Sequence, residues 1–163
     1  KNADKSLLLY RDSFGEALIP LLSTNLGRVM YSQEFPYNLE LNDESYDMIM
    51  IELVERNIPN LLTGAPLMQA SEKQLPTDAV SVSCTVNAQK RSGFTQLYGS
   101  IAAYPAAERI YIEVACTDGA VRVYEAFPVN DSGDADPAWE SASGYLLTLP
   151  EGIEGEVSGA YIG

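Results

Sequence analysis

The sequence contains no histidine, and its 163 residues include only two cysteines, Cys84 and Cys116. Histidine is the usual base beside a nucleophilic serine, so this chain lacks the side chain that most often activates one. It also lacks the Cys and His spacings of a metal site, and we expect neither a metal nor a cofactor. Both cysteines lie in apolar, β-like runs, which favours free, buried thiols over a disulfide.

Positive charge and long apolar runs are scarce as well. Ten Lys and Arg residues stand against 23 Asp and Glu residues, and the net charge is −13. Such a surface repels phosphate backbones and anionic lipids, so nucleic acid is not an expected partner. We find no membrane-spanning run and no signal peptide, and we expect no membrane insertion by this chain. Its first residue is a lysine, which suggests a processed or truncated product.

The first half of the chain alternates apolar strands with helical segments. Strands are predicted over 7–10, 28–32 and 47–54, and the last of these is so continuously apolar that both of its faces should be covered. A helix follows the first strand, and it either kinks at Pro20 or restarts with Pro20 in its first turn. This alternation predicts parallel, neighbouring strands in an α/β sheet.

From about residue 71 the pattern changes to period two. Apolar residues alternate with serine and threonine over 80–86, which predicts a strand with one inward face. Further strands are expected over 94–103, 109–116, 121–127, 145–149 and 156–162. An Asp-Gly turn at 118–119 and the close strand spacing predict an antiparallel β-sandwich. We therefore expect an α/β domain over 1–70 and an all-β domain over 71–163.

A serine at the end of the first strand is the best candidate for reaction chemistry. In residues 7–15, LLLYRDSFG, Ser13 follows a buried strand and precedes a helix. Open α/β sheets present ligands and nucleophiles at this edge, and N–H groups at a helix start can receive an oxyanion. The alternative is that Ser13 only caps the helix, as serine often does.

Three segments within residues 5–62 resemble a known family. RDSFGEALIPLL, GRVMYS and YDMIMIELVERNI resemble the C-terminal half of the bacterial DHHW family, which is related to the alginate O-acetyltransferases. Asp12-Ser13-Phe14 also resembles the serine block of SGNH (GDSL-type) hydrolases. The resemblance implies a partial SGNH-like parallel sheet, in which Ser13 is the nucleophile and Arg56 positions the substrate.

The same resemblance implies an activity for which this chain lacks some of the catalytic residues. In such proteins an Asp-His pair from an earlier segment activates the serine. We therefore expect the parent protein to be an extracellular or cell-surface serine esterase or O-acyltransferase that acts on an acylated polysaccharide or another acyl ester. This chain should be inactive without that upstream segment. Its truncated sheet should leave an exposed apolar face or an unpaired edge that a partner chain or the sandwich covers.

Carboxylates near the serine have narrower expected roles. Glu52 and Glu55 are the remaining candidate bases, although a carboxylate accepts a proton from an alcohol poorly. An ion pair with either of them is the alternative role for Arg56. Asp12 should fix the serine turn by accepting backbone N–H groups, because there is no histidine for it to orient.

The second half resembles the small β-sandwich modules at the C-termini of bacterial cell-surface proteins. IYIEVACTDGAVRVYEAFPV, GYLLTLP and a glycine-rich closing strand carry this resemblance. It implies the alternative function, a non-catalytic module that binds glycan or protein. The acidic loop 130–140 departs from the EF-hand pattern, so a solvated loop is favoured over calcium binding. Aromatic residues that either stack on sugars or line the core are Trp139, Tyr98, Tyr104, Tyr111, Tyr124 and Tyr145.

Overall fold

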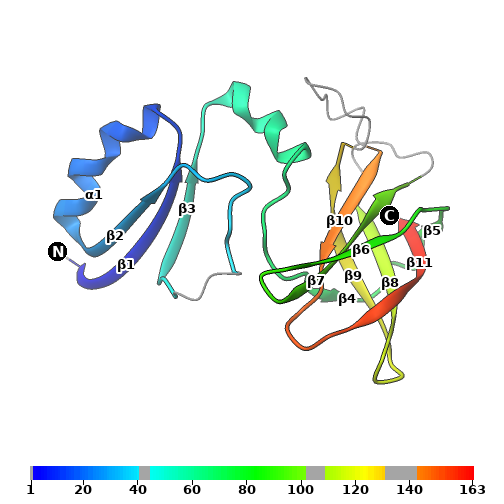
Figure 1. The fold of residues 1–163 in the computed structure, drawn as a ribbon. Coiled ribbons are helices and arrows are strands. Elements are labelled where there is room, and N and C mark those ends of the chain that lie inside the picture. The colour runs from blue at the N-terminus through cyan, green and yellow to red at the C-terminus, as the bar shows by residue number, and fades with distance from the viewer. Residues whose placement is uncertain (1, 41–44, 102–108, 131–142) are drawn as a thin grey trace.

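The protein is mostly β and contains two sheets of different kinds (Figure 1). The computed structural model describes residues 2–40, 45–101, 109–130 and 143–163. A three-stranded parallel sheet with helices comes first in the chain, and an eight-stranded antiparallel sheet follows it. We call these parts the parallel half and the antiparallel half. The expected change from mixed helix and strand to strand alone is confirmed for the described residues.

The parallel half has the expected strand order and direction. Its strands are β1 (Asn2–Arg11), β2 (Leu26–Ser32) and β3 (Met48–Glu52). Its helices are the 3-10 helix η1 (Phe14–Leu18), α1 (Ile19–Asn25) and the 3-10 helix η2 (Glu55–Leu62). The order is β2-β1-β3, and β1 pairs in parallel with both neighbours. Pro20 lies in the first turn of α1, where its missing N–H has no intrahelical acceptor to lose.

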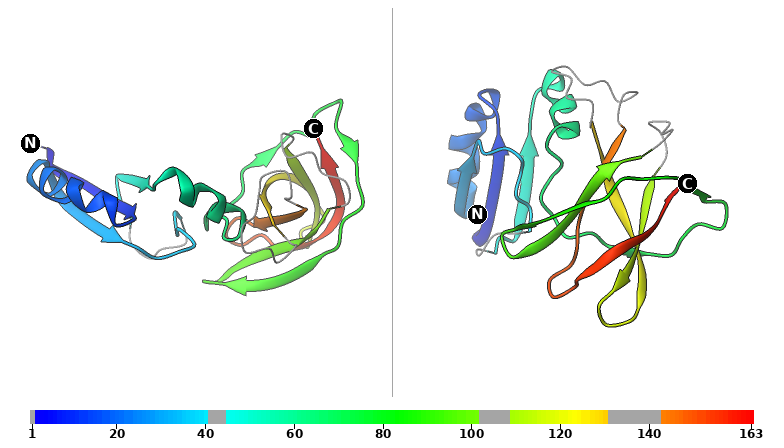
Figure 2. Two further views of the ribbon diagram at one scale, coloured as in Figure 1. Left: turned by 90° about the horizontal axis from the view of Figure 1, so that it is seen from above. Right: turned by 45° about the vertical axis from the view of Figure 1, so that its right-hand side comes forward.

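Helix α1 covers one face of the parallel sheet (Figure 2). On this face Leu9 of β1 lies between its register partners, Tyr31 of β2 and Met50 of β3. The Tyr31 hydroxyl donates to the carbonyl of Ile19 at 3.1 Å and is 2.7 Å from Ser23 Oγ, so α1 packs on the β2 side. Leu9 is fully buried as a result.

A loop covers the carboxyl end of the opposite face. Tyr10 of β1 points to this side, and its hydroxyl donates to the carbonyl of Asn38 at 2.7 Å. The Tyr10 and Tyr37 rings lie 5.3 Å apart between centroids. The polar and aromatic segment after β2 therefore packs back on the sheet. The sequence indicates one helical turn near residues 39–43 of this segment, and residues 41–44 lie outside the described part of the chain.

The prediction that the third strand is covered on both faces is wrong. The Met48, Ile49 and Met50 side chains of β3 are 46%, 38% and 44% exposed. β3 is at the edge of its sheet and pairs only with β1 in the described part of the chain. Helix α1 packs over the β2 side of the sheet, so no segment of the described residues fully covers the side chains of β3. The expected unpaired edge is confirmed there, but the exposed apolar side chains lie on both faces of β3, Met48 and Met50 on one and Ile49 on the other, and the antiparallel half does not bury them.

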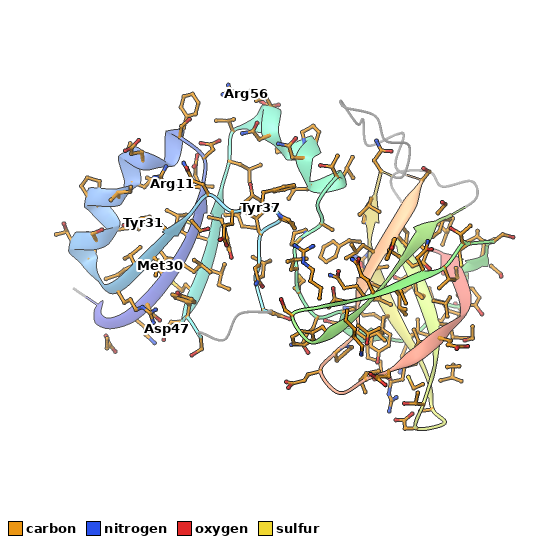
Figure 3. All side chains as sticks on the ribbon, in the orientation of Figure 1. Arg11, Met30, Tyr31, Tyr37, Asp47 and Arg56 are labelled. Atoms are coloured by element: carbon orange, nitrogen blue, oxygen red, sulfur yellow. The ribbon has the colours of Figure 1, made fainter. Side chains whose placement is uncertain are left out.

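One aspartate joins the amino ends of β1 and β3. The Asp47 carboxylate accepts from Lys5 Nζ, the Ser6 backbone N–H and Ser6 Oγ, each at 2.8 Å. The Lys5 ammonium, with the Ser6 donors, holds the pKa of Asp47 well below its usual range. Figure 3 shows Asp47 at the end of the parallel sheet opposite to Arg56. Asp47 therefore fixes the start of β3 against β1.

The antiparallel half contains eight strands in the described residues. They are β4 (Glu72–Lys73), β5 (Val80–Ser81), β6 (Asn87–Arg91), β7 (Phe94–Ser100), β8 (Ile110–Cys116), β9 (Val121–Val129), β10 (Gly144–Thr148) and β11 (Gly155–Ile162). Their order is β5-β11-β8-β9-β10-β7-β6, and β4 pairs with β9. The expected hairpin between β8 and β9 is confirmed, and Gly119 has the positive φ of 85° that its turn requires.

The predicted continuous strand over 80–86 is wrong. Only Val80–Ser81 forms a strand, paired with β11, and Cys84 makes an isolated bridge with Ile101. The segment between them leaves β11 and reaches β7, so it changes partners within a few residues. Val80 and Val86 are 64% and 46% exposed, although the alternation places both inward.

The sheet of the antiparallel half surrounds an apolar core. Core residues come from strands β7 to β11 and their flanks: Leu97, Ile101, Ile110, Ile112, Val114, Cys116, Tyr124, Ala126, Tyr145, Leu147, Leu149, Ala160 and Ile162. Both cysteines are free, as the sequence favoured, but only Cys116 is buried, whereas Cys84 is partly exposed. Tyr111, Tyr124 and Tyr145 are buried, so they form no exposed sugar platform. Tyr104, Trp139 and nearly all of the acidic loop lie outside the described residues.

Backbone hydrogen bonds connect the two halves. The Asn130 N–H, at the end of β9, donates to the carbonyl of Leu62 in η2 at 2.7 Å. Leu67, on the way to the antiparallel half, donates from its N–H to the Tyr37 carbonyl at 2.8 Å. The end of η2 therefore contacts the end of β9, and the segment after β2 contacts the connection between the sheets (Figure 2).

Candidate active site at the carboxyl edge of the parallel sheet

Ser13 lies just beyond the central strand of the parallel sheet. It follows β1 directly and precedes η1, and its side chain is exposed. Its hydroxyl makes no capping hydrogen bond to η1, so the helix-cap interpretation of Ser13 is wrong. The carboxylate of Asp12 caps the turn instead, because its Oδ1 accepts from the Phe14 N–H at 2.8 Å. The serine hydroxyl is thereby left uncommitted at the sheet edge.

Asp12 connects the serine turn to the strand beside it. Its Oδ2 accepts from the Val54 N–H at 2.8 Å and from Asn57 Nδ2 at 3.3 Å. The Val54 N–H has the largest effect in lowering the pKa of Asp12, and the N–H groups of the serine turn add to it. The carboxylate is therefore ionised at neutral pH. It holds the turn against the segment that follows β3, as the sequence predicted for this residue.

Asp12 also uses N–H groups that an oxyanion would need. The Phe14 N–H is donated to its carboxylate, and the Gly15 N–H lies close enough to lower its pKa. The expectation that the start of the helix offers free N–H groups is therefore wrong for both. The Asn57 amide has a second hydrogen besides the one it donates to Asp12, and the Ser13 N–H is not among the groups that bond to the Asp12 carboxylate.

Arg56 lies at the same edge as Ser13. Its side chain is exposed, and its guanidinium carbon is 5.4 Å from the ring centroid of Phe14, the residue after the serine. The alternative role in an ion pair with Glu52 or Glu55 is not seen, since no carboxylate of the described residues is within salt-bridge distance of Arg56. Figure 3 shows Arg56 above the carboxyl ends of the strands.

A buried carboxylate lies beneath the serine turn. Glu52 ends β3 and is the register partner of Arg11 on β1. Glu52 Oε2 and Arg11 Nε are buried and have no hydrogen-bond partner among the described residues. Gly15 lies against both, because a Cβ there would contact the Glu52 carboxylate and lie 2.8 Å from Arg11 Cβ. Only glycine fits over this pair, whereas the other candidate base, Glu55, is exposed in η2.

Tyr37 and Asn57 belong to the same site, and the sequence did not single them out. Burial, together with the charges of Asp12 and Glu52, raises the pKa of the Tyr37 hydroxyl. Tyr37 therefore stays protonated beside two carboxylates. Asn57 could have been found, since it follows the same strand as Arg56, but nothing local distinguishes Tyr37 from other loop tyrosines.

Comparisons with protein families, with curated proteins and with solved structures find no match to this chain. Among the described residues, no group of three or more His, Cys, Asp and Glu side chains is arranged to hold a metal ion. None of the described helices has the length and apolar content needed to cross a membrane.

Proposed function

We propose that this chain is part of an SGNH-like serine esterase or O-acyltransferase that acts on acylated extracellular or cell-surface glycans. In this proposal residues 1–70 are the C-terminal portion of the catalytic domain and 71–163 are a β-sandwich accessory module. One observation carries the proposal. The uncommitted hydroxyl of Ser13 follows the central parallel strand, and its turn is fixed by the Asp12 carboxylate.

The reaction uses Ser13 Oγ as the nucleophile on an acyl carbonyl carbon. An imidazole from another segment takes the hydroxyl proton and later gives it to the departing alkoxide. The Ser13 N–H and the Asn57 amide donate to the oxyanion of the tetrahedral intermediate. Water or an acceptor hydroxyl then attacks the acyl-serine ester, and the direction of transfer depends on which of them reaches it.

Arg56 acts on the substrate rather than on the reacting bond. Its guanidinium stands beside the serine turn without a carboxylate partner among the described residues. It is available to hold an anionic or hydroxylated acceptor next to the acyl group. This role separates Arg56 from Ser13 in its expected effect on kinetics.

The missing base needs a surface on which its segment can dock. The unpaired edge of β3 offers such a surface, and its carboxyl end at Glu52 adjoins the serine turn. A segment paired with this edge extends the parallel sheet and covers part of Met48 and Met50 on one face and of Ile49 on the other. It brings its own side chains to the carboxyl ends of the strands.

The isolated chain tests the need for a base. Purified as it stands, it should hydrolyse p-nitrophenyl acetate no faster than its Ser13→Ala variant, because no imidazole is present. Release of p-nitrophenol is followed by absorbance for both proteins at equal concentration. Rapid turnover that disappears in Ser13→Ala would show that the chain contains its own base.

The longer parent protein tests the proposal itself. It should gain esterase or acyltransferase activity that Ser13→Ala and replacement of the added histidine both abolish. Arg56→Ala should reduce kcat/KM for the natural acceptor by about ten-fold or more and leave p-nitrophenyl acetate nearly unaffected. Arg109→Ala, which removes an exposed arginine of the antiparallel half, is the matched control. A parent protein that is inert toward acyl esters and acetylated glycans, yet binds a polysaccharide, would favour the non-catalytic module.

A further inference from the structure

A cleft of about 320 Å³ lies between the two halves, and none of its lining residues belongs to the serine turn. One wall comes from the parallel half and the connection, at Phe35, Pro36 and Gly64. The other wall comes from the antiparallel half, at Arg91, Tyr98 and Leu146. This volume is at the lower end of the range of about 300–1,000 Å³ that is usual for small-molecule sites. The cleft therefore has room for one small ring compound.

Strand register explains why Arg91 and Tyr98 line the same wall. Arg91 of β6 lies opposite Phe94 of β7, and Leu146 of β10 lies opposite Tyr98. Side chains alternate along β7, so Phe94 and Tyr98 point to the same face of the sheet. Arg91, Tyr98 and Leu146 thus share the outer face, on the opposite side from the core residue Leu97.

The aromatic ring on the other wall is held in place but remains open to solvent. The Phe35 ring packs edge-on against Tyr37, with 5.5 Å between centroids. It also lies against Gly64, where any Cβ would overlap the ring. Even so, Phe35 is 45% exposed. A fixed and exposed aromatic ring in a cleft offers a flat surface for stacking at a small cost in side-chain entropy.

Arg91 differs from most basic residues of this acidic chain. Basic side chains with a carboxylate within salt-bridge distance are Lys5, Lys73, Lys90, Arg109 and Arg122. Arg91 has no ion pair and no hydrogen bond with its side chain in the part of the chain that the structure describes. It therefore presents an uncompensated guanidinium to the cleft, although the net charge of the protein is −13.

We propose that this cleft binds a six-membered ring that carries one carboxylate, with the ring against Phe35 and Tyr98 and the carboxylate on Arg91. A guanidinium pairs with a carboxylate through two parallel hydrogen bonds, which fixes the orientation of the ring. A single negative charge fits better than several, because Arg91 is the one charged residue among those that line the cleft and the net charge of the protein is −13. An acidic sugar and an aromatic acid share this chemistry. The proposal does not depend on the activity of Ser13.

The test is a titration of the whole chain followed by amide chemical shifts. The acidic probes are glucuronate and benzoate, and glucose and benzyl alcohol are their uncharged counterparts. At least one acid should saturate shifts at residues 63–67 and 97–99 with a Kd of millimolar order. Its uncharged counterpart should bind about ten-fold more weakly, or not at all. Saturation by glucuronate alone identifies a sugar site, and saturation by benzoate alone identifies a site for aromatic acids.

Two charge-removing variants separate the cleft from general electrostatics. Arg91→Gln should weaken binding of the acid by about ten-fold, the size expected for one charge-assisted pair at a partly exposed site. Lys90→Gln removes the same charge one residue away on the other face of β6, where Lys90 pairs with Glu154, and should change binding less than two-fold. Any of three results would overturn the proposal: the acid and its uncharged counterpart bind equally, both variants lose affinity equally, or neither acid saturates the shifts at about 10 mM.

Discussion

The exposed β3 strand makes a quantitative prediction about stability. Leu9 and Met50 are register partners on the same face of the parallel sheet, but Leu9 is fully buried and Met50 is 44% exposed. Leu9→Ala removes three buried carbons, worth about 2.4 kcal/mol of transfer free energy, and leaves a cavity, so we expect a loss of about 3 kcal/mol. Met50→Ala removes a side chain that is only a little over half buried, and water fills the space. Its expected loss is about 1 kcal/mol.

The assay is urea unfolding of both variants, with hydrogen exchange of the β1 amides to assign the change to the parallel half. Leu9→Ala should lower the free energy of unfolding about three times as much as Met50→Ala. If Met50→Ala costs as much as Leu9→Ala, then β3 is covered in solution and its open edge is not a docking surface. Repeating both measurements over a range of protein concentrations shows whether a second copy provides the cover.

Two further predictions concern single contacts. In the folded protein the pKa of Asp12 lies below its ordinary value of 3.8, so its contribution to stability is present above about pH 4 and is lost as pH falls through the folded-state pKa. The amide resonances of Val54 and Phe14 should follow one titration below pH 3.8. A titration above that value would contradict the carboxylate contacts. Gly99→Ala places a Cβ against the backbone of Thr85, 2.7 Å from its carbonyl carbon. The substitution should lower the free energy of unfolding by about 1–3 kcal/mol and Tm by about 2–10 °C in thermal unfolding. An unchanged Tm would show that β7 moves to accept the methyl group.

Local patterns in the sequence were sufficient for much of the fold. The apolar run at 7–10, the proline restart at Pro20 and the Asp-Gly turn at 118–119 each depend on neighbouring residues alone, and the structure has all three. Local patterns do not determine which side chains of a strand are buried, because the segments that cover the strand are distant in the sequence. The sequence over 47–54 predicts a buried strand, although side chains of that strand are exposed. The sequence over 80–86 predicts one strand, although the segment pairs first with β11 and then with the end of β7.

The candidate site was predictable only where it follows the strand pattern. Ser13 and Arg56 each follow a parallel strand, so the topology alone brings them to one edge. Tyr37 enters the site from a loop that packs back on the sheet, and no periodicity signals that packing. The loss of the Phe14 N–H to Asp12 is likewise a matter of side-chain rotamer, which spacing does not determine.

The position of β1 has a consequence for the order in which the parallel half assembles. β1 precedes β2 and β3 in the sequence and is central in its sheet, so β2 and then β3 add to either side of a strand that is already present. The β1–β2 pairing closes only residues 12–25, through η1 and α1, whereas the β1–β3 pairing closes residues 12–47. Loop-closure entropy therefore favours β1–β2 as the early nucleus, with β3 docking later. During synthesis, the serine turn and α1 can form before Asp47 and Val54, the residues that fix β3 against β1, have left the ribosome.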